Sequence, residues 1–317
     1  MLLARVAEQL YWAARYVERA EMTARVVSEH THLLVDLPTT VPLTWEPLLD
    51  VPGARGFVPA TTEREVVAYL LADADNPSSV LSSVVTARSN LRSAREMLSR
   101  EAWEAVNNLY LYVTSHHSEG VDRWSRGRFL DRVIAETQRL DGILATTMSR
   151  DATYQFLRLG RSIERADMTG RVLDARAVPL LADLAPGAKH TEVQWAALLR
   201  SLSALQAYYQ RKLAPMSGPA AVRLVLHDPD FPGSIEHCLG EMATTLTELP
   251  NADASLTATE HARRSLTRMF GFSDALHDGL LGLRHDLAAV HDQIHATYFP
   301  PVPLPDPVMP SVATRAD

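Results

Sequence analysis

The sequence has almost no cysteine, no long apolar run and no excess of positive charge. Cys238 is the single cysteine in 317 residues, so an internal disulfide and a cluster of thiolate metal ligands are both excluded. The net charge of -7 argues against general binding to a phosphate backbone. Hydrophobic residues make up 46% and charged residues 22%, which are values typical of globular proteins. We therefore expect a globular protein that does not bind nucleic acid.

Membrane-spanning and secretory segments are missing as well. No apolar stretch reaches the length of a transmembrane helix. Charged side chains interrupt the apolar residues near the N-terminus before a signal-peptide core could form, namely Arg5, Glu8, Arg15 and Glu18. These patterns predict a cytoplasmic protein without a membrane partner.

Signatures of familiar catalytic chemistry are also absent. The sequence contains no glycine-rich phosphate loop and no G-x-S-x-G nucleophile motif. Glu29 and His32 form a Glu-x-x-His element, which di-iron helical bundles need on two facing helices. The equivalent positions in the internal duplication described below are Ala175 and Val178, so the second half of such a site is missing. We expect no metal site and no bound cofactor.

Helical periodicity, by contrast, runs through nearly the whole chain. The apolar spacing predicts helices at about 2–35, 63–73, 78–99, 101–116, 121–148, 152–182, 190–212, 219–226, 233–248, 255–270 and 274–297. Five prolines between Asp36 and Thr62 predict a loop with at most a short helical turn. Repeated prolines predict an extended, mobile tail over 300–317. The expected fold class is all-α.

An internal duplication divides the chain. Residues 14–27 align with 160–173 at an offset of 146, and eight of the fourteen positions are identical. Two shorter matches follow in the same order, 44–49 with 194–199 and 73–80 with 228–235. Such collinear matches indicate duplication followed by short insertions. We predict a helical bundle of two tandem pseudo-repeats, 1–148 and 149–299, which pack as one body ahead of the tail.

Both copies of the repeated helix keep the same polar face. Because each helical residue turns about 100° around the axis, most of the identical residues fall on one side. The arginines of this face are the candidate ligand-binding residues, namely Arg15, Arg19, Arg25, Arg161, Arg165 and Arg171. The glutamates Glu18 and Glu164 are the candidate catalytic groups.

Three interpretations of this face remain open. Its charges could form surface ion pairs, such as Glu21 with Arg25 four residues later. They could instead form an internal network in which the two helices satisfy each other's charges. They could also line a polar cleft, because arginines bind carboxylates and phosphates in a bidentate way.

A repeated D-x-D-x-P-x-S pattern precedes one expected helix in each half. We interpret it as helix punctuation, in which the proline opens the helix and the serine lies in its first turn. The alternative is that Ser79 and Ser234, at two helix N-termini, help the arginines to hold an anion.

Taken together, these residues resemble the bacterial alpha-E domain family. The resemblance rests on Y-V-E-R-A-E-M-T-A-R at 16–25, F-L-R-L-G-R-S-I-E-R-A-D-M-T-G-R at 156–171, and A-R-S-N-L-R-S-A-R-E at 87–96 followed by Trp103, Glu104 and Asn107. It extends to about Tyr298. The resemblance implies a helical domain found beside, or fused to, a circularly permuted ATP-grasp protein and transglutaminase-like peptidases. It supplies no settled catalytic residues.

Three functions follow as hypotheses. The leading one is an accessory or scaffold protein that acts with an ATP-grasp type peptide or amide ligase, through a polar Arg/Glu cleft between the repeats. The second is an enzyme in which Glu18 or Glu164 acts as general acid or base on a carboxylate or peptide substrate. The third is a binding module for a small molecule or peptide.

Overall fold

The protein is built from helices throughout the part of the chain that can be described. The computed structural model describes residues 4–38, 41, 43–52, 62–182, 190–211, 215–269 and 273–300. No strand occurs within these ranges, so the predicted all-α class is confirmed. None of their helices combines the length and the apolar character that crossing a bilayer requires. The predicted proline-rich tail lies outside the described residues from 301 onward.

The first half of the chain contains one long helix followed by shorter ones. Its elements are α1 (Ala4–Asp36), η1 (Glu46–Asp50), α2 (Glu63–Leu71), α3 (Val80–Ser93), η2 (Arg95–Met97), α4 (Arg100–Val121) and α5 (Arg126–Thr147). The prediction that the helix over 101–116 ends at residue 116 was wrong, and His116 and His117 lie inside α4. Both imidazoles bond back to backbone oxygens within α4, and the helix continues to Val121.

The second half again opens on a long helix. Its elements are α6 (Ala152–Val172), the π-helical turn η3 (Leu173–Ala177), α7 (Val178–Ala182), α8 (Thr191–Ser201), α9 (Leu205–Gln210), α10 (Gly218–His227), α11 (Ile235–Thr247), α12 (Asp253–Leu266) and α13 (Ser273–Tyr298). The single helix predicted over 190–212 is two helices, because Ser203 adopts a positive φ of 56° between them.

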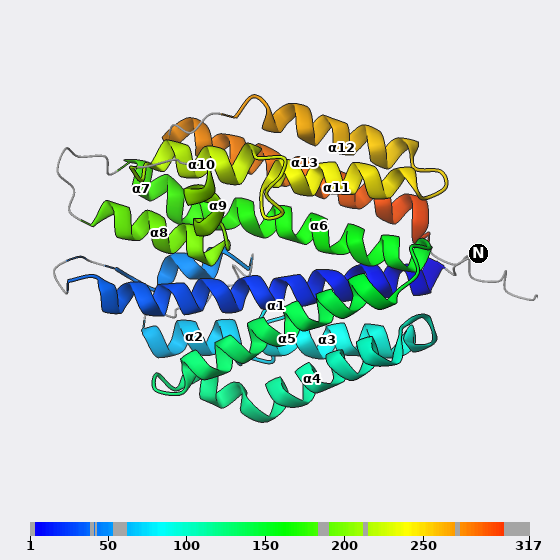
Figure 1. Ribbon diagram of the computed structural model, residues 1–317, viewed down its shortest axis with the longest axis horizontal. Helices are drawn as coiled ribbons and strands as arrows, with labels where there is room; N and C mark the ends of the chain where they lie inside the picture. Colours follow the sequence, from blue (N-terminus) through cyan, green and yellow to red (C-terminus); the bar gives the residue numbers. More distant parts are fainter. Residues whose placement is uncertain are drawn as a thin grey trace, which may run out of the picture.

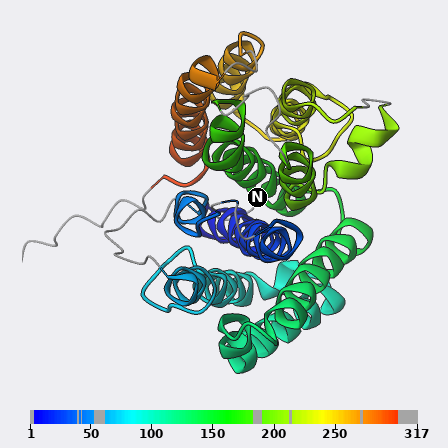
Figure 2. The same cartoon turned by 90° about the vertical axis from the view of Figure 1, so that its left-hand side faces the viewer.

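Helices α1 and α6 form the centre of the molecule. They run side by side in the same direction, with the other helices of each half on opposite sides of this pair (Figures 1 and 2). Helices α3 and α5 pack on α1, while α11 and α13 pack on α6. Helix α8 reaches across from the second half to α1. The division at 148/149 falls in the link between α5 and α6, and the duplication itself stays a prediction.

A glycine of α6 allows the two central helices to approach closely. Gly160 of α6 lies against α1, and a Cβ atom added there would lie 2.1 Å from the carbonyl oxygen of Tyr11. No ordinary contact is that short, so any larger residue at this position must push the helices apart.

We therefore expect Gly160→Ala to lower the free energy of unfolding by about 1–3 kcal/mol through overpacking. Gly142→Ala is the matched control, because Gly142 also lies inside a helix but has nothing within 4 Å of the added methyl group. The control should raise stability by up to about 1 kcal/mol, since alanine is the better helix former. Chemical denaturation measures both, and a neutral or stabilising Gly160→Ala would contradict the close approach.

Candidate functional site

Two Glu-Arg dipeptides exchange partners between the central helices. Glu18 of α1 accepts hydrogen bonds from Nε and Nη2 of Arg165 at 2.6 and 2.7 Å. Glu164 of α6 accepts one from Nε of Arg19 at 2.6 Å. Glu18 and Glu164 are only 2% and 1% exposed. The polar face that both copies share is therefore an internal ionic interface, in which each acid pairs with the other helix's arginine.

A third arginine, Arg15, makes the two halves of this network unequal. Arg15 donates from Nε to Glu164 at 2.7 Å. Arg161, which aligns with Arg15, instead pairs with Asp141 of α5 at 3.0 Å. Glu164 thus faces two guanidinium groups, whereas Glu18 faces one.

The two glutamates consequently differ in acidity. Burial raises the pKa of Glu18, and the attraction of Arg165 offsets this only in part. Burial would also raise the pKa of Glu164, but Arg15 and Arg19 together hold it below its usual value. The same dipeptide therefore has two electrostatic environments in one molecule.

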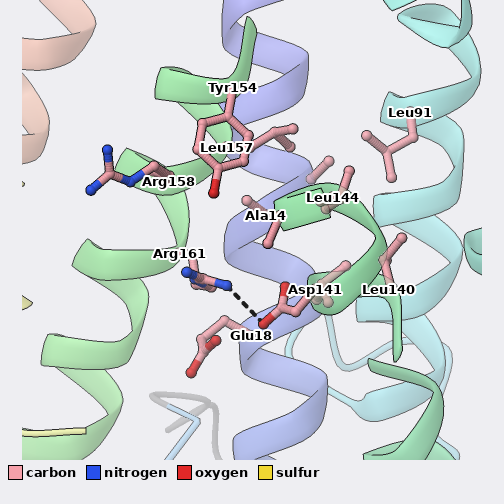
Figure 3. Close-up of a pocket in the computed structure, with 13 residues that line it drawn as sticks. Ala14, Glu18, Leu91, Leu140, Asp141, Leu144, Tyr154, Leu157, Arg158 and Arg161 are labelled. Atoms are coloured by element: carbon pink, nitrogen blue, oxygen red, sulfur yellow. Dashed lines mark ion pairs between the residues drawn. The ribbon is translucent and has the colours of Figure 1, made fainter. Parts of the chain in front are cut away.

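A small cavity lies beside Glu18, between α1, α5 and α6. Figure 3 shows the ion pair of Arg161 and Asp141 next to Glu18, with leucine side chains around them. The cavity volume is about 30 Å³, enough for about two water molecules. This space does not accommodate a substrate next to the carboxylate.

Among the described residues, Glu18, Glu21 and Asp141 form an acidic group whose oxygen atoms lie within 4.8 Å of one another. Each of these carboxylates already pairs with a guanidinium, from Arg165, Arg25 and Arg161 respectively. A cation would have to displace these partners, so the group is explained by the ionic interface itself.

Two aromatic residues and a histidine surround Arg15. Its guanidinium lies 4.7 Å from the ring of Trp12, and the Tyr11 hydroxyl lies 2.9 Å from Nδ1 of His291. Burial raises the pKa of Tyr11 to about 12, while burial and Arg15 lower that of His291 to about 4. His291 is therefore neutral at pH 7, and its Nδ1 shares a hydrogen bond with the Tyr11 hydroxyl.

A basic pocket opens next to Arg15, between α6 and α13. Its volume is about 400 Å³, and its charged lining residues are Arg15, Arg171, Arg284 and Asp167, with His285 and His291 beside them. Asp167 pairs with Arg171 at 2.9 Å. Arg284 has no ion-pair partner within the described ranges. Arg15 pairs with Glu164 and Arg171 with Asp167, so Arg284 is the lining guanidinium that adds positive charge to this pocket.

The remaining candidate residues lie in local structures. Arg25 and Arg171 pair with acids four residues earlier on their own helices. Ser79 and Ser234 are fully buried, and each accepts a hydrogen bond from the backbone N–H three residues later, at 3.0 Å. They are the N-cap residues of α3 and α11, so the prediction that they lie in the first turn was wrong by one position. Ligand binding by these residues stays a prediction.

These features define an all-helical domain whose two central helices are joined by exchanged Glu-Arg ion pairs. The chain belongs to the Alpha-E family, described as a predicted alpha-helical domain with a conserved ER motif, and the family model matches residues 2–299. Glu18-Arg19 and Glu164-Arg165 are ER dipeptides of this kind. The expected family membership is confirmed.

Similar curated proteins occur in mycobacteria. An uncharacterised protein of Mycobacterium bovis and uncharacterised proteins of two Mycobacterium tuberculosis strains are each 26% identical to this chain over 324 residues. Each match covers 92% of this chain but 35% of the relative. The chain thus spans about a third of the length of these relatives. No solved structure is a significant match.

The ionic interface predicts a large effect of Glu164→Gln. Removing this acid leaves Arg15 and Arg19 without their shared counterion, which should cost roughly 3 kcal/mol of unfolding free energy. Glu104→Gln makes the same chemical change in an exposed pair with Arg100 and should cost less than about 0.5 kcal/mol. Equal effects in urea denaturation would contradict a buried interface.

The cost of Glu164→Gln should also depend on pH. The lowered pKa of Glu164 stabilises the wild type above the ordinary glutamate pKa of about 4.3, and this contribution is lost as the pH falls through the lowered value. The difference between wild type and variant should therefore shrink in acid. If the difference in unfolding free energy between wild type and variant stays constant as the pH is lowered, the charge of Glu164 is not the source of its stabilising effect.

Proposed function

We propose that this chain is a non-catalytic accessory domain that acts in the cytoplasm with an ATP-grasp type peptide or amide ligase. In this proposal the basic pocket holds an acidic group of the ligase or of its substrate. The observation that carries the proposal is the set of three guanidinium groups, from Arg15, Arg171 and Arg284, that faces one carboxylate.

The arrangement of these arginines supports anion binding. Arg15 and Arg171 are held in place by Glu164 and Asp167, so little side-chain freedom would be lost when an anion binds. Arg284 would gain a counterion. Because the chain as a whole carries a charge of -7, a local positive pocket also distinguishes this surface from the rest of the molecule for an acidic partner.

The position of the two central glutamates favours an accessory role over catalysis by this chain. A general acid or base must reach the reacting proton within about 2.6–3.2 Å, directly or through one water. Glu18 and Glu164 are buried and bound to arginines, and the cavity beside Glu18 is too small for a substrate. These facts give little support to the enzyme hypothesis.

The length of the relatives supports a companion domain. About two thirds of each mycobacterial relative lies outside the match, which leaves room for other domains in the same polypeptide. An ATP-grasp companion, and more distantly a transglutaminase-like peptidase, are the partners that the alpha-E resemblance implies.

The test is binding of this chain to the purified circularly permuted ATP-grasp protein of the same organism, measured by isothermal titration calorimetry. We expect Arg284→Gln to weaken binding about tenfold, the effect of one charged hydrogen bond. Arg264→Gln removes the same charge from an exposed position on α12 and should have no effect.

Two outcomes would count against the proposal. Absence of binding to the ligase would contradict the proposed partner. Equal affinity of wild type and Arg284→Gln for the ligase would show that the basic pocket does not contribute to binding.

A further inference from the structure

A second cavity lies further along the two central helices. It has a volume of about 240 Å³ and is lined by His30 of α1, Arg176 of η3, and residues of η1, α7 and α8. His30 is 15 residues beyond Arg15 on the same helix, which corresponds to roughly 22 Å along the axis. This cavity is therefore separate from the basic pocket.

Two buried polar side chains in this cavity have nitrogen atoms without a hydrogen-bond partner among the described residues. His30 is 2% exposed and Arg176 is 8% exposed. Within the described part of the chain, both ring nitrogens of His30 and Nη1 of Arg176 have no hydrogen-bond partner. The neighbouring acid, Glu29, pairs with Arg200 at 2.7 Å instead.

The isolation of Arg176 is unusual for a buried arginine of this protein. Arg126 is 1% exposed, yet it pairs with Glu63 at 2.8 Å and donates to the backbone oxygens of Gly120 and Val121. Burial lowers the pKa of Arg176 to about 10, with a small opposing effect of Glu29, so the side chain stays charged at pH 7. An unpaired buried charge is costly, and a bound anion would relieve that cost.

The local backbone explains how Arg176 comes to face the cavity. It lies in the π-helical turn η3, and such turns often occur at functional sites. At the offset of 146 residues, Arg176 corresponds to His30, so equivalent positions of the two halves of the sequence supply the two polar groups. His30 packs against Trp45, with ring centroids 4.4 Å apart. Burial and Arg176 lower the pKa of His30 to about 3, which keeps it neutral.

We infer that this cavity binds a small monocarboxylic acid with an apolar body. The carboxylate pairs with Arg176 and accepts a hydrogen bond from the neutral imidazole of His30. The leucines of the lining, Leu33, Leu43, Leu48 and Leu180, surround the apolar body. One guanidinium matches one negative charge, whereas a phosphate dianion would bring a second charge into a site without a second cation.

The first experiment measures ligand binding to the full chain by thermal shift and calorimetry. The probes are acetate, isovalerate and benzoate, with isovaleramide and inorganic phosphate as comparators. We expect isovalerate or benzoate to raise the melting temperature, with neither comparator having this effect. If none of the three carboxylates binds at millimolar concentration, the inference is overturned.

Three variants locate the binding. Arg176→Met should weaken carboxylate binding more than tenfold and raise the melting temperature of the ligand-free protein, because it removes an unpaired buried charge. Arg126→Met, the matched control for a partnered buried arginine, should lower the melting temperature. Arg284→Gln should leave carboxylate binding unchanged, which separates this site from the basic pocket.

Two results with these variants would overturn the inference. One is equal carboxylate binding in wild type and Arg176→Met. The other is a loss of stability in Arg176→Met as large as that in Arg126→Met, which would indicate a structural role.

Discussion

The exchanged ion pairs between α1 and α6 are the interaction on which the rest of the structure depends. Four charged groups, Glu18, Arg19, Glu164 and Arg165, lie at the contact between two helices that are surrounded by other helices. A buried charge is tolerated only when its partner is in place, so the two helices must meet in one register. The close approach at Gly160 allows that register. Every other helix then packs on one of these two or on a neighbour.

The ionic interface also connects the fold to the proposed binding sites. Arg15 belongs to both, because it pairs with Glu164 and lines the basic pocket. Further along the chain, Nη1 of the buried Arg176 has no hydrogen-bond partner among the described residues. Selection for stability alone would favour pairing a buried arginine with an acid or replacing it with an apolar residue. Of the arginines proposed to bind ligands, Arg15 and Arg171 pair with acids, whereas Arg284 has no ion-pair partner among the described residues.

The sequence allowed the helices and the shared polar face to be predicted, because both follow from periodicity and from the alignment of 14–27 with 160–173. It could not show which residues contact that face, since a helical wheel gives the direction of each side chain but not its neighbours. The partner of Arg161 was also beyond reach, because Asp141 comes from α5 and has no place in the aligned segments. His30 and Arg176 lie beyond the aligned segments, and the cavity depends on the π-helical turn and on loops that periodicity does not describe.

A double-mutant cycle on Glu18 and Arg165 tests the central claim most directly. Each residue is replaced by methionine singly and together, and the unfolding free energies of the four proteins are compared. A buried, bidentate pair predicts a coupling energy above about 1 kcal/mol, beyond the range of exposed pairs. A coupling within about 0.3 kcal/mol of zero would mean that the two residues act independently, and the ionic interface would then not be what joins the helices.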